Sequence, residues 1–336
     1  MNEKILITGA SGFVGSFLIE EGLRRQMLTW AGIRKTSTRQ YLQDERIRFV
    51  ELDFIHLDAL TRQLSAHKKV HGGWDYIVHC AGITKCRRTE DFERVNHIGT
   101  KNFVEALQAL DMVPKKFIYI STLGVFGPIH EKDYRPIREN DEPQPDTAYG
   151  RSKLESEHVI ASRKGWPYII FRPTGIYGPR EKDYFLMVKA IKNHVDFSVG
   201  FKKQLITFVY VKDLVQAIYK AVEKKVVRRT YCLTDGHVYT GRSFSDYLRK
   251  ELGNPWVIRI KSPLFVLKAI SWLAEFAASC LGKVSTLNRD KYKIMKQRNW
   301  QCDITPAATE LGYTPEYPLE RGVKEIVSWY KEEGWI

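Results

Sequence analysis

The chain has 336 residues, of which 43% are hydrophobic and 27% are charged, and its formal net charge is +14. It contains no internal repeat and no low-complexity tract, so the composition is that of a globular protein. The Lys and Arg residues are dispersed and match no nucleic-acid-binding module, which excludes nucleic acid as the expected partner. The five cysteines, Cys80, Cys86, Cys232, Cys280 and Cys302, lack C-x-x-C spacing. We therefore expect neither a metal site nor a disulfide framework.

The N-terminal stretch MNEKILITG enters a predicted strand almost at once. It leaves no room for the charged and apolar regions of a secretory signal, so we expect a cytoplasmic protein. The strand, over residues 5–8, is followed by three glycines and then by an apolar pattern of helical spacing from residue 13. A helix that begins there directs its first backbone amides and its dipole at an anion, and glycine lets a diphosphate approach them. The residues of this turn are Gly9, Ser11, Gly12, Phe13, Val14 and Gly15.

Taken alone, the spacing G-x-x-G-x-x-G also suits a strand-to-helix turn that binds nothing, since it differs by one residue from the usual dinucleotide motif. The context decides between the two. Further strands are predicted over 29–35, 47–54, 76–82, 116–124 and 168–173, and helices over 57–67, 91–110 and 149–165. Strands that alternate with helices predict an α/β fold with a doubly wound parallel sheet.

The regular pattern breaks after residue 172, returns over 206–222 and breaks again. We therefore expect a dinucleotide-binding domain formed by residues 1–172 and 205–232. The remaining segments, 173–204 and 233–336, are expected to form a smaller substrate-binding lobe.

In doubly wound folds, ligands bind at the carboxyl ends of the strands. Besides the glycine turn, the residues at these ends are Arg34, Lys35, Asp53, Phe54, Ala81, Gly82, Ser121 and Thr122. We expect them to lie along one edge of the sheet and to form a single site.

Tyr149 and Lys153 stand four residues apart in the predicted helix YGRSK, so their side chains share one face. A lysine cation beside a phenol favours the phenolate, and we expect it to lower the pKa of Tyr149. Such a tyrosine can exchange a proton with a substrate hydroxyl or carbonyl near neutral pH.

Together, the motifs TGASGFVG, HCAG, RVNHIGTKN, STLGVFG, YGRSK, RPTGIYGP and VYVKDL resemble the extended branch of the short-chain dehydrogenase/reductase superfamily, also called the NAD-dependent epimerase/dehydratase family. The resemblance covers nearly the whole chain. The C-terminal segment resembles the ending of 3β-hydroxysteroid dehydrogenase-like and dihydroflavonol-reductase-like members, and its pattern of CD followed by LGY also occurs in sugar-modifying relatives. The resemblance to the superfamily implies a Rossmann fold and hydride transfer to or from a nicotinamide cofactor.

The resemblance also implies roles for individual residues. Tyr149 is the general acid/base, Lys153 its partner and a ligand of the nicotinamide ribose, and Thr122 orients the reacting oxygen. Asn96 braces the central helix, and a purely structural role remains open for it. The cofactor-binding residues are then Gly9, Ser11, Gly12, Phe13, Val14, Gly15, Arg34, Lys35, Asp53, Phe54, Ala81, Gly82, Asn96, Tyr149, Lys153, Pro173 and Ile176.

Three departures from the family pattern bear on function. Leu123 and Gly124 replace the Asp-Glu pair that follows the threonine in sugar 4,6-dehydratases, so dehydration by that route is excluded. The arginine that many nucleotide-sugar enzymes carry before the equivalent of Phe208 is missing. Arg34 and Lys35 stand where an aspartate would select NAD, which favours NADP over NAD, although an arginine here can instead stack on adenine.

The stretch 262–283 predicts a helix with a wide apolar face and a narrow polar stripe of Lys268, Ser271, Glu275 and Ser279, which excludes a transmembrane span. One alternative is that this helix packs, on the second lobe or against the partner of a homodimer. The others are that it covers an apolar substrate site or that it touches a membrane surface through residues 263–281.

The sequence thus predicts an NAD(P)-dependent oxidoreductase that acts on a small-molecule secondary alcohol or ketone, with an apolar alicyclic or lipid-like substrate favoured. The alternatives are a nucleotide-sugar epimerase that retains NAD and a non-catalytic cofactor-sensing protein. The candidate substrate residues are Lys85, Leu123, Gly124 and Arg180.

Overall fold

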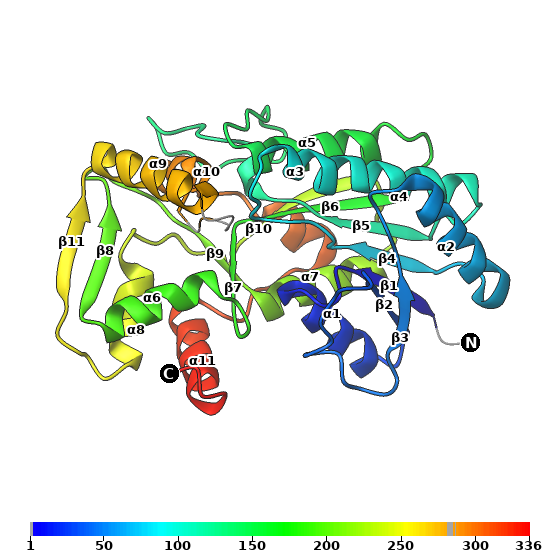
Figure 1. Cartoon of the computed structure of the whole chain (residues 1–336), viewed down its shortest axis with the longest axis horizontal. Helices are drawn as coiled ribbons and strands as arrows, with labels where there is room; N and C mark the ends of the chain where they lie inside the picture. The colour runs from blue at the N-terminus through cyan, green and yellow to red at the C-terminus, as the bar shows by residue number, and fades with distance from the viewer. Residues whose placement is uncertain (1–2, 281–284, 286) are drawn as a thin grey trace. The chain divides into compact units, whose positions relative to one another are not determined.

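Seven strands form one sheet in the order β10-β6-β5-β4-β1-β2-β3 in the computed structural model, which describes residues 3–280, 285 and 287–336 (Figure 1). The order confirms the predicted doubly wound parallel sheet. The strands are β1 (Lys4–Thr8), β2 (Leu28–Ile33), β3 (Arg48–Glu51), β4 (Tyr76–His79), β5 (Lys116–Ile120), β6 (Tyr168–Pro173) and β10 (Arg229–Leu233). The last is absent from the sequence prediction, because the charged run KKVVRR that leads into it obscures its short apolar pattern.

Helices cover both faces of this sheet, with α2, α4 and α5 on one side and α1 and α7 on the other (Figure 1). Their bounds are α1 (Phe13–Arg24), α2 (Leu57–His71), α3 (Glu90–Phe92), α4 (Gly99–Ala109), α5 (Ala148–Ala161) and α7 (Val211–Glu223). The predicted helix over 91–110 is a continuous run of α3, the π-helical segment η1 (Glu93–Ile98) and α4. The predicted strand over 116–124 ends at Ile120 and is followed by the 3-10 turn η2 (Leu123–Val125).

The chain divides into two compact units. Unit 1 comprises Met1–Val125, Ala148–Arg172 and Val215–Tyr231, and unit 2 comprises Phe126–Thr147, Pro173–Leu214 and Cys232–Ile336. Segments 126–147 and 205–214, predicted in the dinucleotide-binding domain, thus fall in unit 2. The reason is main-chain pairing within that unit: Ile137 pairs with Cys302, and β9 (Phe208–Tyr210) pairs with β7 (Gly175–Tyr177). The two units are nearly equal in length, so the second is not the smaller lobe that the sequence predicts.

Unit 2 is built around a cluster of aromatic side chains that includes Tyr177, Phe208, Tyr210, Phe244 and Tyr330. Its other elements are α6 (Asp183–Lys192), β8 (Val195–Val199), α8 (Ser243–Glu251), β11 (Ile258–Ser262), α9 (Leu264–Cys280), α10 (Arg289–Lys296), the π-helical segment η3 (Ala307–Leu311) and α11 (Leu319–Glu332). The predicted helix over 262–283 corresponds to α9, and its last part, after Cys280, lies outside the described residues. Within the described residues, no helix is long and apolar enough to cross a bilayer.

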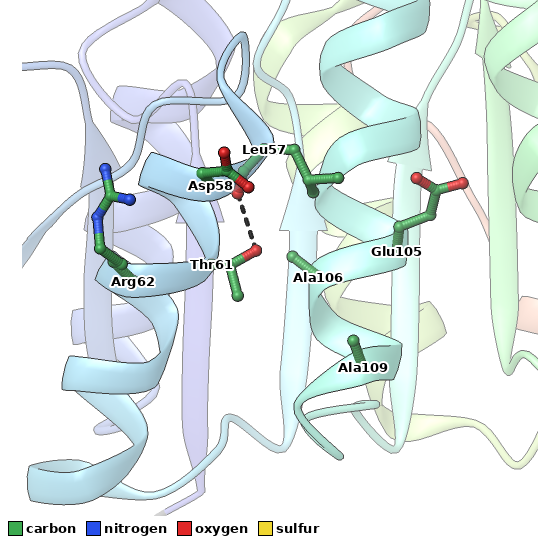
Figure 2. A pocket seen from close by; sticks show the side chains of 7 residues that line it. All are labelled: Leu57, Asp58, Thr61, Arg62, Glu105, Ala106 and Ala109. Atoms are coloured by element: carbon green, nitrogen blue, oxygen red, sulfur yellow. Dashed lines mark hydrogen bonds between the residues drawn. The ribbon is translucent and has the colours of Figure 1, made fainter.

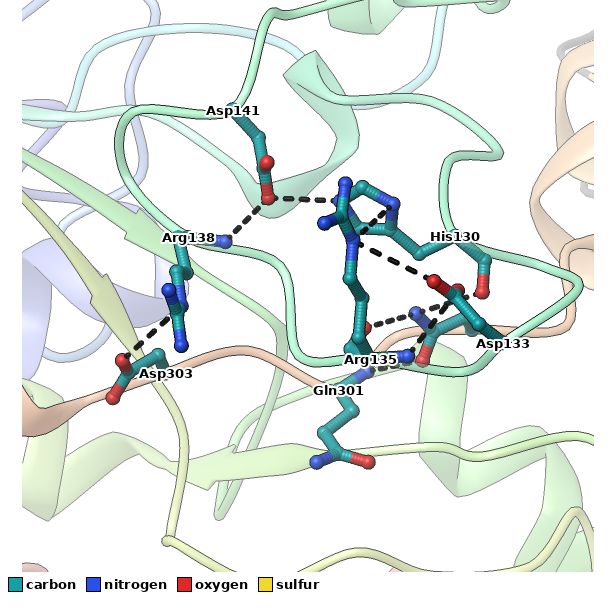
Figure 3. A network of polar contacts seen from close by, with 8 residues as sticks. His130, Asp133, Arg135, Arg138, Asp141, Gln301 and Asp303 are labelled. Atoms are coloured by element: carbon teal, nitrogen blue, oxygen red, sulfur yellow. Dashed lines mark hydrogen bonds and ion pairs between the residues drawn. The ribbon is translucent and has the colours of Figure 1, made fainter.

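The Pro-rich segment 126–147 is held in unit 2 by the polar network of Figure 3. The Ile137 N–H donates to the Gln301 carbonyl at 2.8 Å, and the Asp303 N–H donates to the Ile137 carbonyl at 2.9 Å. The His130 ring joins Asp141 through Nε2 at 2.9 Å and accepts from Arg135 through Nδ1 at 3.0 Å. The segment is therefore an ordered part of unit 2.

Candidate active site

The glycine turn between β1 and α1 is tightly packed on its inner side. Gly9 has φ +65°, and a Cβ added to it would lie 2.9 Å from the Ala81 nitrogen. A Cβ on Gly15 would lie 2.2 Å from the Gly9 carbonyl oxygen. A larger residue at Gly9 would push the turn away from the loop after β4, and a larger residue at Gly15 would push the start of α1 away from the backbone of Gly9 and Ala10.

The outer side of the same turn presents the start of α1. Gly12 is the N-cap and offers no side chain to bond the first amides, and the first helical bond runs from the Ser16 N–H to the Gly12 carbonyl at 3.0 Å. The N–H groups of Phe13 and Val14 precede that bond and so lack an acceptor within the helix. The turn therefore has the form of an anion site for a phosphate group.

The end of β2 carries the expected cations. Arg34 and Lys35 are exposed, and neither forms an ion pair with another residue in the described part of the chain. The Arg34 N–H donates to the Ser37 hydroxyl at 3.1 Å, and the Ser37 N–H donates back to the Arg34 carbonyl at 2.9 Å. The tight turn that results leaves the Ser37 hydroxyl proton available for a further acceptor.

Asp53 lies after β3, where its carboxylate accepts from the Ile55 N–H at 3.1 Å and joins His56 Nδ1 at 2.8 Å. Partial burial pushes the pKa of Asp53 up, but these hydrogen bonds outweigh it and hold the pKa below its usual value. Phe54 packs edge-on against His79 and Phe103. Asp53 thus shapes the turn into α2, and its contact with adenine stays a prediction.

Asn96 joins the loop after β4 to α5. Its Oδ1 accepts from the Ile83 N–H at 2.8 Å, and its Nδ2 donates to the Ile83 carbonyl at 3.1 Å and to the Ser152 hydroxyl at 3.0 Å. The loop that contains Ala81 and Gly82 is fixed in this way from two sides. These are the contacts of a structural brace.

The three predicted catalytic residues all belong to unit 1. Thr122 follows β5, and its Oγ1 accepts from the Gly124 N–H at 3.1 Å, which leaves its own hydroxyl proton free to be donated. Tyr149 lies in the first turn of α5, with its ring edge-on to Phe92 at 5.8 Å. Lys153 is one turn further along, and its Nζ lies 4.0 Å from the centre of the Tyr119 ring.

Burial sets the protonation of this pair. It raises the pKa of Tyr149 to about 12 and lowers the pKa of Lys153 to about 7. The prediction that Lys153 lowers the pKa of Tyr149 is therefore wrong for the chain by itself, because desolvation of the buried phenol is what shifts its pKa, and it shifts it upward. Near neutral pH, Tyr149 therefore keeps its proton.

A buried ion pair that the sequence analysis misses lies at the end of β5, next to the predicted catalytic residue Thr122. Glu157 is bonded to Arg172 with a shortest N–O distance of 2.6 Å, and it accepts from the Ser121 hydroxyl. Ser121 immediately precedes Thr122, so the carboxylate fixes the end of β5. A signal was present in the sequence, since Glu157 follows Lys153 by four residues and so shares its helix face.

His79 is a second residue that the sequence analysis misses. Its ring nitrogens join the hydroxyls of Thr8 at 2.8 Å and Thr100 at 3.0 Å, and burial lowers its pKa to about 3. The neutral ring ties β1, β4 and α4 together beneath the site. Its partners are remote in sequence, and no spacing rule reveals them.

The remaining predicted residues are distributed between the units. In unit 1, Leu123 is fully buried, whereas Gly124 and Lys85 are partly exposed. Pro173, Ile176 and Arg180 belong to unit 2, at the end of β6, on β7 and in the loop after it. The roles of these residues toward cofactor or substrate stay predictions.

A sequence model of the NAD-dependent epimerase/dehydratase family matches residues 5–233. The chain belongs to this family. The match begins at β1, includes the glycine turn and the Tyr149–Lys153 pair, and ends at the last strand of the sheet. The chain is therefore an enzyme of the extended short-chain dehydrogenase/reductase superfamily.

Similar proteins within the family have diverse activities. A UDP-glucose 4-epimerase of Vibrio cholerae is 25% identical, with 97% of this chain and 94% of that protein covered. A 3β-hydroxysteroid-dehydrogenase/decarboxylase of Arabidopsis thaliana is 26% identical, with 96% and 61% covered. The solved structure of the Bordetella bronchiseptica enzyme WbmG with NAD and UDP is 18% identical, has a TM-score of 0.78 and covers 99% of this chain and 96% of that one. The last likeness establishes the fold.

The glycine turn fits the dinucleotide that the family uses. Gly9 and Gly15 allow the close backbone approach, and the uncapped start of α1 faces outward with its amides. These residues would hold the diphosphate, and Lys153 would hold the nicotinamide ribose.

A shallow hollow of about 380 Å³ also lies in unit 1, between α2 and α4 (Figure 2). Leu57, Thr61 and Ala106 are among its lining residues. None of the predicted site residues lines it, so it is not part of the candidate active site.

Proposed function

We propose that this family member transfers a hydride between NADP and a secondary alcohol or the corresponding ketone. The observation that carries the proposal is the composition of the catalytic set. It contains one proton-transfer group, Tyr149, and one hydroxyl partner, Thr122, whereas the next two positions, Leu123 and Gly124, cannot transfer a proton. One proton and one hydride are what interconversion of an alcohol and a ketone requires.

A bound nicotinamide supplies the hydride acceptor or donor. The Thr122 hydroxyl, whose oxygen already accepts from Gly124, donates to the substrate oxygen and orients it. Tyr149 moves the proton between its phenolic oxygen and the substrate oxygen, and its raised pKa suits donation to a developing alkoxide.

The end of β2 supports NADP as the preferred cofactor. Arg34 and Lys35 directly follow the last residue of β2, where they are exposed cations in place of an aspartate. Ser37 keeps a hydroxyl proton that can be donated to a phosphate oxygen. A 2′-phosphate would gain charge-assisted hydrogen bonds there. The similar solved structure of WbmG contains NAD, so the proposed preference for NADP rests on Arg34, Lys35 and Ser37 of this chain.

An apolar substrate is supported at two positions where sugar-modifying family members carry charged side chains and this chain carries apolar ones. Leu123 is fully buried beside Thr122, and Ile206 occupies the position two residues before Phe208 and packs beside the aromatic core of unit 2. The resemblance to a 3β-hydroxysteroid-dehydrogenase/decarboxylase is consistent with this choice. We therefore propose a bulky alicyclic or lipid-like alcohol.

A nucleotide-sugar epimerase is the second candidate, favoured by the resemblance to a UDP-glucose 4-epimerase and by the cations Lys85 and Arg180. In that reaction the same hydride leaves the sugar and returns to it, so the cofactor stays bound.

One experiment separates the two candidates. The purified protein is denatured and any released nucleotide is identified, and thermal unfolding is then followed with added ligands. The proposal predicts empty protein that binds NADPH reversibly and, with NADP bound, is protected by alicyclic alcohols. Stoichiometric NAD in the purified protein, with strong protection by a nucleoside diphosphate and none by the alcohols, would reverse the order of the candidates.

A further inference from the structure

Helix α9 of unit 2 turns its large apolar side chains away from the protein. The exposed fractions are 74% for Phe265, 55% for Trp272, 56% for Leu273 and 62% for Phe276. Phe265 precedes Trp272 by seven residues, or about two helical turns, and Trp272 and Leu273 precede Phe276 by four and three residues. The four side chains therefore share one side of the helix, where Trp272 and Phe276 stack with ring centroids 6.0 Å apart.

The opposite side of α9 is the one that packs on the protein. Leu267 and Ser271 are buried, and the Ser271 hydroxyl donates to the Leu267 carbonyl at 2.7 Å. Glu275 pairs with Arg289 at the start of α10 at 3.1 Å. Part of the polar stripe predicted from the sequence thus faces the protein. In an ordinary surface helix, and in a helix that packs on its own lobe, the wide apolar face would be buried and the polar stripe exposed.

The apolar surface continues at the beginning of α9. Figure 1 shows β11 leading directly into this helix. β11 is paired with β8, and the Gly200 N–H that follows β8 donates to the Ser262 carbonyl at 2.9 Å. Phe201, 67% exposed, lies at this corner with the Lys261 Nζ 5.1 Å from its ring centre. We call Phe201, Phe265, Trp272, Leu273 and Phe276 the α9 surface.

The charges around the α9 surface are nearly all positive. Exposed Lys261 lies over Phe201, exposed Lys268 is on α9 itself, and exposed Lys202 follows Phe201 in the chain; none of the three forms an ion pair with another residue that the structure describes. The segments 195–205 and 256–280 contain two acidic residues, Asp196 and Glu275, and each is held by an arginine. The surface therefore presents aromatic side chains and unneutralised ammonium groups together.

From this combination we infer that the α9 surface binds an anionic lipid membrane, lying on it without crossing it. Aromatic and leucine side chains enter the boundary between headgroups and acyl chains, and lysines beside them attract anionic headgroups. A second copy of the chain fits less well, because a symmetric contact would bring the same lysines together without acidic partners. The inference does not depend on the proposed reaction.

Sedimentation with vesicles tests this binding on the full-length protein. Phosphatidylcholine vesicles with and without phosphatidylglycerol are compared, at low and high salt. We expect binding to the anionic vesicles, at least about tenfold weaker binding to neutral ones, and weakening by salt.

Two double variants locate the contact. Trp272→Ser with Phe276→Ser removes exposed rings, and Lys261→Glu with Lys268→Glu reverses exposed charges. Each is expected to weaken binding to the anionic vesicles at least about tenfold. The matched control is Lys69→Glu with Val70→Ser, at two exposed positions of α2 in unit 1, which is expected to bind as wild type does.

Thermal unfolding of each variant verifies that the fold is retained. We expect retention because the substituted side chains are exposed. The inference is overturned if wild type does not bind the anionic vesicles, or if folded variants bind as tightly as wild type. It is also overturned if sedimentation equilibrium shows a wild-type dimer that Trp272→Ser with Phe276→Ser dissociates, since a second copy then covers the surface.

Discussion

Lys153→Met is expected to stabilise the cofactor-free protein while it abolishes turnover. Lys153 is buried, and burial lowers its pKa from 10.5 to about 7. The folded state therefore binds fewer protons than the unfolded state between these two values, and stability rises with pH across that window. At one pKa unit per ~1.36 kcal/mol, the buried lysine costs about 5 kcal/mol near pH ~6 and about 2 kcal/mol near pH ~9. The gain from Lys153→Met is thus about 3 kcal/mol larger at the lower pH.

Urea denaturation of wild type and variant over this pH range measures the difference. Packing changes caused by the methionine shift the free energy of unfolding by the same amount at every pH, so the slope alone reports the lysine. Lys101→Met, at an exposed position on α4, is the matched control and should give no such slope. A difference between wild type and Lys153→Met that does not change with pH would refute the reasoning.

Three further variants test other parts of the site. Tyr149→Phe should lower turnover by about 10² or more with cofactor affinity nearly unchanged, since only the proton donor is lost; retention of half the activity would contradict its role. Arg34→Ala should weaken NADPH binding by about 1.5–3 kcal/mol and NADH binding much less, as titration calorimetry can measure; equal losses would leave Arg34 as a residue that stacks on adenine. Gly15→Ala should lower the thermal midpoint because its Cβ would meet the Gly9 carbonyl oxygen at 2.2 Å, whereas Gly73→Ala, with open space around it, should not; equal midpoints would show that the turn relaxes.

The sequence predicts most of unit 1 because local rules govern it. Alternating strands and helices give the parallel sheet, and the strand-end rule selects Arg34 and Thr122 as candidate site residues without knowledge of any contact. Glycine spacing finds a turn whose close contacts the structure then explains. What local rules do not give is the pairing of distant segments, such as Glu157 with Arg172, or Ile137 with Cys302.

The structure differs from the sequence predictions in two further respects, because a sequence pattern does not say which residues are buried. The pattern of α9 separates an apolar face from a polar stripe but does not say which one faces the protein, and Ser271 is the buried one. The spacing of Tyr149 and Lys153 predicts their shared helix face, but desolvation, which raises one pKa and lowers the other, depends on the surrounding elements.

The proposed function requires net exchange of a hydride between the cofactor and an alcohol or ketone. The most direct test follows nicotinamide absorbance when the purified protein and NADPH are mixed with a panel of alicyclic ketones, with Tyr149→Phe as the inactive control. We expect net oxidation of NADPH by at least one ketone, and its loss in Tyr149→Phe. Interconversion of nucleotide sugars by protein that retains its NAD, with no net change in nicotinamide absorbance for any ketone, would contradict it.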